Sequence, residues 1–121
     1  MIVDFHNHYY PPGFVDAARR GKSAFRVTED GDGNPVLHSP GDYNVLVPGH
    51  RDLDARAADL DAGGVDAQGI TMTAPGTSIE TPERAGELAR TIDDGLAAGR
   101  EAQPGGYVRL GHVRLVIPER A

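Results

Sequence analysis

The sequence predicts an α/β fold built around a parallel sheet, and three observations lead to this prediction. Short apolar segments at 1–8, 65–73 and 107–117 are typical of buried strands. Two segments with apolar residues at helical spacing, beginning at Arg51 and Thr81, separate these strands. Strands that alternate with helices form right-handed βαβ units, so we expect the three strands to run parallel in one sheet.

The first strand is expected over residues 1–8, where the apolar residues Ile2, Val3 and Phe5 suit a buried position. A Pro-Pro-Gly segment at 11–13 follows it. Two successive prolines remove hydrogen-bond donors and the glycine permits a turn, so extended pairing should end there.

Residues 21–49 are enriched in Gly, Pro, Asp and Ser, unlike the rest of the chain. A turn-rich piece at 29–35 lies between short extended runs at 25–27 and 36–38. This pattern predicts a small hairpin excursion, and a flexible linker is the alternative.

The first helix is expected from Arg51, because Leu53, Ala57 and Leu60 form one apolar stripe at i, i+4 and i+7. A Gly-Gly pair at 63–64 can adopt the left-handed conformation that ends a helix. The result would be an amphipathic helix of about three turns.

The second helix is expected from a Thr-Pro-Glu segment at 81–83, which combines a capping residue, a proline at the first helical position and an acidic first turn. Its apolar residues recur with helical period at Ala85, Leu88, Ala89, Ile92 and Leu96. Gly86, Gly95 and Gly99 each lower helix propensity by up to about 1 kcal/mol relative to alanine, so tertiary packing must stabilise this helix. A Pro-Gly-Gly segment at 104–106 should end it.

Composition limits what the chain can be. A length of 121 residues allows one ordinary domain, and an aromatic content of 6% leaves few large side chains for its core. The net charge of -6 argues against a nucleic-acid partner. There is no basic start followed by an apolar stretch and no apolar run long enough to cross a bilayer, so no membrane partner and a cytoplasmic location are expected. Cysteine is absent, so a metal site would use His and carboxylate ligands.

The strongest functional signal is the segment Asp4-Phe5-His6-Asn7-His8. Side chains at i and i+2 of a strand point to the same face, so His6 and His8 could share one metal ion. The carboxyl ends of strands are also where α/β folds build their sites. Two exposed polar residues at a strand end are the alternative reading of such a short motif.

In its context this motif resembles the start of the amidohydrolase superfamily, and more closely the branch that contains aminocarboxymuconate-semialdehyde decarboxylase and the resorcylate-type decarboxylases. The likeness continues through residues 51–68, where a helix with an Asp-Leu-Asp element leads through Gly-Val-Asp into the second strand. It returns at 89–97, which is similar to a family helix containing Asn-Asp-x-Leu-Ala, and the Pro-Glu-Arg-Ala ending fits the same frame. The likeness spans the chain apart from 21–49.

The resemblance implies the N-terminal part of a (β/α)8 TIM-type barrel, with residues 1–121 forming a single partial domain. In this family a divalent ion, most often Zn²⁺, is held by two N-terminal histidines, a later histidine and a late aspartate, and only the first pair carries over, onto His6 and His8. The implied activity is that of a metal-dependent decarboxylase or hydrolase acting on a small aromatic or muconate-type carboxylic acid.

The other three histidines are expected to have different roles. His38 lies in the excursion where the related decarboxylases often place a basic residue that contacts substrate. His50 precedes a helix and is most simply a solvated loop residue. His112 lies in the third strand and is more readily a structural imidazole than a functional one. Arg109 and Arg114 depart from the mostly apolar third strand of the family.

Such a barrel needs about 250 residues and eight strands, so the family resemblance predicts a truncated protein with weak metal binding and no efficient turnover alone. An uncovered sheet edge further predicts a homo-oligomer, or association with a complementing chain. Two alternatives stay open: a non-catalytic metal- or ligand-binding α/β module, and one half of a split barrel enzyme.

Overall fold

The computed structural model describes residues 1–102 and 107–109, and it confirms the α/β class. The elements of this part of the chain are β1 (Val3–Asp4), α1 (Pro12–Arg19), β2 (Arg26–Glu29), β3 (Pro35–Ser39), β4 (Asp42–Val45), α2 (Pro48–Arg51), α3 (Leu53–Gly63), β5 (Ala67–Ile70), α4 (Pro82–Ala102) and β6 (Tyr107–Arg109).

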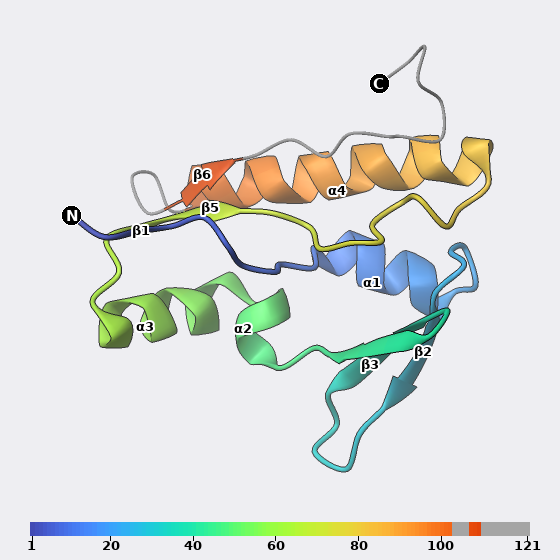
Figure 1. The fold of residues 1–121 in the computed structure, drawn as a ribbon, viewed down its shortest axis with the longest axis horizontal. Helices are drawn as coiled ribbons and strands as arrows, with labels where there is room; N and C mark the ends of the chain where they lie inside the picture. The colour runs from blue at the N-terminus through green and yellow to red at the C-terminus, as the bar shows by residue number, and fades with distance from the viewer. Residues whose placement is uncertain (103–106, 110–121) are drawn as a thin grey trace.

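The predicted parallel sheet is present, with the strand order β1-β5-β6 (Figure 1). Val3 lies opposite Ala67, and Gly69 lies opposite Val108, both in parallel register. The helical connections between the strands make this arrangement possible, because parallel strands cannot be joined by a tight turn. Residues 110–117 of the predicted third strand lie outside the described residues.

The first strand is shorter than predicted, because pairing with β5 is confined to Val3–Asp4. Ile2 is 58% exposed and Phe5 is 62% exposed, so the prediction that these two side chains are buried in the first strand is wrong. Both residues lie just outside β1, and their apolar side chains are in solvent in the described part of the chain.

The Pro-Pro-Gly segment was expected only to end the strand, but it also begins helix α1. Proline is favoured at the first helical position because its missing N–H has no helical partner there. Phe14, Val15, Ala17 and Ala18 of α1 are buried, and the helix packs against α4. Two covering helices were predicted, whereas residues 1–102 contain four.

The excursion at 21–49 is a three-stranded antiparallel sheet of order β2-β3-β4, so the flexible linker is excluded. Val36 and Leu37 of β3 are buried against the core, whereas Tyr43 of β4 is 63% exposed. The small sheet extends from the end of α1 (Figure 1) and returns the chain to α2.

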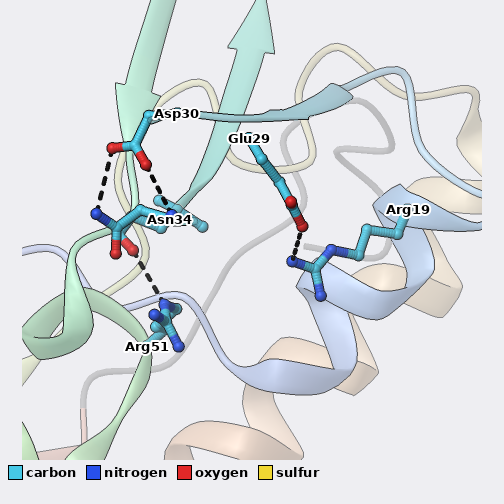
Figure 2. Close-up of polar contacts among 6 residues, drawn as sticks. Arg19, Glu29, Asp30, Asn34 and Arg51 are labelled. Atoms are coloured by element: carbon cyan, nitrogen blue, oxygen red, sulfur yellow. Dashed lines mark hydrogen bonds and ion pairs between the residues drawn. The ribbon is translucent and has the colours of Figure 1, made fainter. Parts of the chain in front are cut away.

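Polar contacts connect the two ends of the β2–β3 turn, and an exposed ion pair joins β2 to α1 (Figure 2). The Asp30 carboxylate accepts hydrogen bonds from the backbone N–H groups of Asn34, at 2.8 Å, and Asp32, at 3.0 Å. These donors, the Asn34 amide first among them, lower the pKa of Asp30 because they favour its charged form. Arg19 of α1 lies 3.7 Å from the Glu29 carboxylate of β2.

The helix predicted from Arg51 is α3, which begins at Leu53 after the N-cap Asp52, and Arg51 is the last residue of the short helix α2. The Asp52 carboxylate accepts from the backbone N–H groups of Asp54 and Ala55, as an N-cap residue does. Gly64 ends α3 with a φ of 68°, as the Gly-Gly pair predicted. The predicted stripe of α3 is only half-buried, and the buried residue of this helix is Arg56.

Helix α4 has 21 residues and buries the apolar face that the sequence predicted. Ile92 and Leu96 are fully buried among Tyr10, Phe14 and Ile70. Gly95 allows a close approach to α1, because a Cβ atom at this position would lie 2.4 Å from the Pro11 Cβ. Within the described residues, neither α4 nor any other helix has the length and apolar character needed to span a membrane.

We expect Gly95→Ala to destabilise the protein, although alanine is the better helix former. Overpacking against Pro11 should cost about 1–3 kcal/mol and outweigh the gain in helix propensity of about 1 kcal/mol. Urea unfolding followed by circular dichroism measures the difference. Ala98→Gly at an exposed position of the same helix is the control, which should lose only the propensity term; a stabilised Gly95→Ala would contradict the close helix contact.

The Asp30 carboxylate should make the stability of the small sheet depend on pH. Because its folded pKa is lowered, its contribution is fully present above the unfolded pKa of about 3.9 and is lost as the pH falls through the folded pKa. Asp30→Asn should therefore lower the Tm at pH 7 and have a smaller effect at pH 2.5. Asp32→Asn, which keeps the Asp32 N–H donor, is the control; equal effects of Asp30→Asn at both pH values would refute this role.

Candidate functional site

His6 and His8 lie in the loop that follows β1, at the carboxyl end of the parallel sheet. Beyond β1 the loop runs alongside the continuation of β5, since the Tyr9 N–H donates to the Thr71 carbonyl at 2.9 Å. The Thr71 hydroxyl in turn donates to the Asn7 carbonyl at 2.8 Å. These bonds hold the loop at the edge of the sheet where α/β folds place their ligand sites.

The structure brings the two imidazoles together. Their ring centroids are 5.8 Å apart, and both rings line one cavity of about 410 Å³. His6 is exposed and His8 is half-buried. The residues that share this cavity with the pair include Gly49, His50, Arg56, Asp59 and Gln68.

The surroundings of His8 favour its neutral form. Burial lowers the pKa of His8, and the nearby His50, His6 and Arg56 lower it further because a positive charge among them is unfavourable. A neutral imidazole carries the lone pair that a metal ion needs. At neutral pH His8 is therefore in the form of a ligand.

A second set of contacts fixes the backbone on the His6 side. The His6 N–H donates to the Asp4 carboxylate at 2.8 Å, and the Gln68 side-chain amide donates to the other oxygen of Asp4. The bond from Gln68 is the main cause that lowers the pKa of Asp4. Asn7, between the two histidines, donates its amide to the Gly69 carbonyl at 2.7 Å.

His50 belongs to this cavity, so its interpretation as a solvated loop residue is wrong. It is half-buried in α2, and its Nδ1 lies 3.2 Å from the Val45 carbonyl, which can only accept a hydrogen bond. That contact orients the ring with Nδ1 as donor in the neutral form. The sequence around His50 does not predict its place in the cavity, because the fold of residues 36–47 brings α2 next to the loop that carries His6 and His8.

Arg56 and Asp59 of α3 also line the cavity, and the sequence analysis missed both. A signal for Arg56 was available. Position 56 lies three residues after Leu53 and four before Leu60, on the same helical face as the apolar stripe. A charged residue on a core-facing stripe is a candidate for a buried polar network.

His38 lies elsewhere in the molecule. Its Nε2 is 2.8 Å from the Thr28 hydroxyl, its ring is beside Tyr43, and it is not among the residues that line the cavity of His6 and His8. The substrate role of His38 stays a prediction. His112 and Arg114 lie outside the described residues, as does the side chain of Arg109.

No group of three or more His, Cys, Asp or Glu side chains within residues 1–102 is arranged to hold a metal ion. His6 and His8 would thus need ligands from outside the described residues.

Comparisons with solved structures identify the fold. IDCase from Metarhizium anisopliae matches 92% of this chain with a TM-score of 0.75 at 19% identity. The 5-carboxyvanillate decarboxylase from Novosphingobium aromaticivorans, solved with manganese and 4-hydroxy-3-methoxy-5-nitrobenzoic acid, matches 98% with a TM-score of 0.68 at 21% identity. A 2,6-dihydroxybenzoate decarboxylase in complex with 2,6-dihydroxybenzoate matches 99% with a TM-score of 0.62 at 21% identity.

These matches show that the chain shares the fold of one part of each of these three decarboxylases. The chain spans about a third of the length of each of the three: 34%, 35% and 33%. No protein-family model and no curated protein matches the sequence.

Tyr10 packs beside the site, with its ring centroid 6.3 Å from that of His50. Burial raises the pKa of Tyr10 to about 12, so its hydroxyl stays protonated at neutral pH. This hydroxyl has no hydrogen-bond partner among the described residues, although the side chain is 1% exposed.

We therefore expect Tyr10→Phe to raise the free energy of unfolding by about 1 kcal/mol, because it removes a buried hydroxyl whose desolvation is uncompensated. Chemical denaturation measures the change. Tyr43→Phe, at a position 63% exposed, is the matched control and should change stability little. A loss of stability in Tyr10→Phe alone would show that the hydroxyl has a partner.

Proposed function

We propose that residues 1–121 form the N-terminal part of a TIM-type barrel of the aromatic-acid decarboxylase class and contribute two ligands, His6 and His8, to a divalent-metal site. The observation that carries this proposal is the pairing of the two imidazoles in one cavity at the carboxyl end of a parallel sheet. The match to TIM-barrel enzymes over about a third of their length supports the barrel.

The spacing of the imidazoles fits a shared ion. Two imidazoles that bind one ion through nitrogen at about 2.0–2.1 Å, with a tetrahedral angle between them, have ring centroids about 5 Å apart. The observed 5.8 Å is close to this value, and the lowered pKa of His8 keeps its ring neutral. The donor set therefore fits a divalent metal, and we propose Zn²⁺ with Mn²⁺ as the competitor to test, since one matched structure contains manganese.

When bound, the ion would supply Lewis-acid polarisation of a substrate oxygen and lower the pKa of a bound water. The chain itself would hold the ion through His6 and His8. The Arg56 guanidinium on the cavity wall adds a fixed positive charge that favours an anion there. The substrate class that follows is a small carboxylic acid, aromatic or muconate-type, which agrees with the benzoic acids in two of the matched structures.

A non-catalytic metal-binding role for the chain by itself is the second candidate. It rests on the same pairing of His6 and His8 in one cavity. A split enzyme, in which another polypeptide supplies the later ligands, would use the same half-site, meaning the pair His6 and His8. It would differ from the second candidate because activity would appear when the two polypeptides are mixed.

Metal titration tests the half-site. We expect the unmodified chain to bind one Zn²⁺ or Mn²⁺ per molecule in isothermal titration calorimetry. His6→Ala and His8→Ala should each abolish measurable binding, because a single imidazole leaves most of the coordination shell to water. His38→Ala is the control, since His38 lies outside the cavity and should leave metal affinity unchanged.

Two outcomes would contradict the proposal. Metal binding that survives both His6→Ala and His8→Ala would place the ion elsewhere. Decarboxylation of 2,6-dihydroxybenzoate by residues 1–121 alone would show that the site is complete without further ligands.

A further inference from the structure

The guanidinium of Arg56 is the most highly connected polar group beside the histidine pair. Arg56 is 6% exposed, and burying a charge is costly unless hydrogen bonds compensate. Its Nε donates to the Gln68 side-chain oxygen, its Nη1 donates to the carbonyls of His8 at 3.0 Å and Gly49 at 2.7 Å, and its Nη2 donates to the Asn7 side-chain oxygen at 2.8 Å.

These acceptors come from three different segments of the chain. His8 and Asn7 belong to the loop after β1, Gly49 belongs to α2, and Gln68 belongs to β5. All four acceptors are uncharged carbonyl or amide oxygens. The arginine, which itself lies on α3, thus joins one segment to three others through directional bonds.

Both histidines are connected to this guanidinium. His8 is bound directly, through its own carbonyl. His6 is bound indirectly, because Gln68 accepts from Arg56 and donates to Asp4, whose carboxylate accepts the His6 N–H at 2.8 Å. Contacts that originate at one side chain therefore reach the backbone on each side of Asn7, and they act together with the hydrogen bonds from this loop to Gly69 and Thr71.

We infer that Arg56 is a positioning residue that sets the separation and direction of the His6 and His8 imidazoles, and so the affinity of the half-site for metal. The part of this inference that concerns metal rests on the proposed function. The positioning itself is a property of the metal-free chain.

The shape of the guanidinium group explains why arginine is required at position 56. A guanidinium presents five N–H donors in a rigid plane, whereas the lysine ammonium is a single point on a flexible stem. Lysine at position 56 can keep the positive charge but cannot reach the loop, α2 and β5 at the same time. Arg56→Lys therefore removes the hydrogen-bond geometry of the guanidinium and keeps the positive charge.

The first measurement uses the metal-free chain. In Arg56→Lys we expect the nuclear Overhauser contacts between the His6 and His8 rings, whose centroids are 5.8 Å apart, to weaken, and the amide resonances of both residues to shift and broaden. Arg51→Lys is the matched control, because Arg51 donates to the Leu46 carbonyl at 3.0 Å and does not line the cavity of the pair. It should leave these signals in place.

The second measurement uses Co²⁺ as a spectroscopic probe of the half-site. Arg56→Lys should lower the affinity for Co²⁺ by about 10-fold, the lower end of what loss of supporting contacts around metal ligands costs, and should change the visible absorption of the bound ion. Arg51→Lys should change neither. Asp4→Ala, at a half-exposed position, removes only the indirect contact to His6 and should give a smaller loss of Co²⁺ affinity. This variant keeps the inference testable if Arg56→Lys does not fold.

The outcomes distinguish the two proposals. If the unmodified chain binds no Co²⁺ but the His6 and His8 signals change in Arg56→Lys, the metal site fails and the positioning role stands. If Co²⁺ binds equally well to the unmodified chain, Arg56→Lys and Asp4→Ala, the inference is overturned while the metal site stands. Unchanged ring contacts in a folded Arg56→Lys variant would also overturn it.

Discussion

The hydrogen bonds of one buried guanidinium hold the candidate site together. Arg56 comes from α3, yet its donors reach the loop after β1, the end of α2 and the central strand β5. A buried charge that lost these acceptors would be strongly unfavourable, so the four segments are constrained to meet at this point. The strand β1 ends at Asp4, before either histidine, so this network and the bonds from the loop to Gly69 and Thr71 hold the segment that carries both.

The apolar core depends on close helix packing. Ile92 and Leu96 of α4 meet Phe14 of α1 in the buried cluster, and Gly95 lets the backbone of α4 approach Pro11. Pro11 directly follows Tyr10 and begins the turn into α1. The contact between Gly95 and Pro11 therefore also fixes the end of the loop that carries His6 and His8. Core packing and site geometry are thus coupled through a few residues at the start of α1.

Sequence periodicity predicted the elements whose stabilisation is local or repetitive. The strands around Val3 and Ile70, the termination of α3 at Gly64 and the apolar face of α4 all follow from patterns that span a few residues. The helix α1 was missed because Pro11 and Pro12 end a strand as readily as they begin a helix, and only burial of the following residues against α4 decides between the two. The expected burial of Phe5 failed for the same reason, because apolar character alone does not create a partner surface.

The sequence by itself determined that His6 and His8 follow a strand of a parallel α/β fold, since motif spacing and strand alternation are properties of the chain. Their placement beside His50, Arg56 and Gln68 was decided only by the tertiary structure. The physical reason is that these contacts join residues 48, 49 and 64 positions apart. Hydrogen-bond partners at such separations are chosen by the packing of whole elements, which no local pattern encodes.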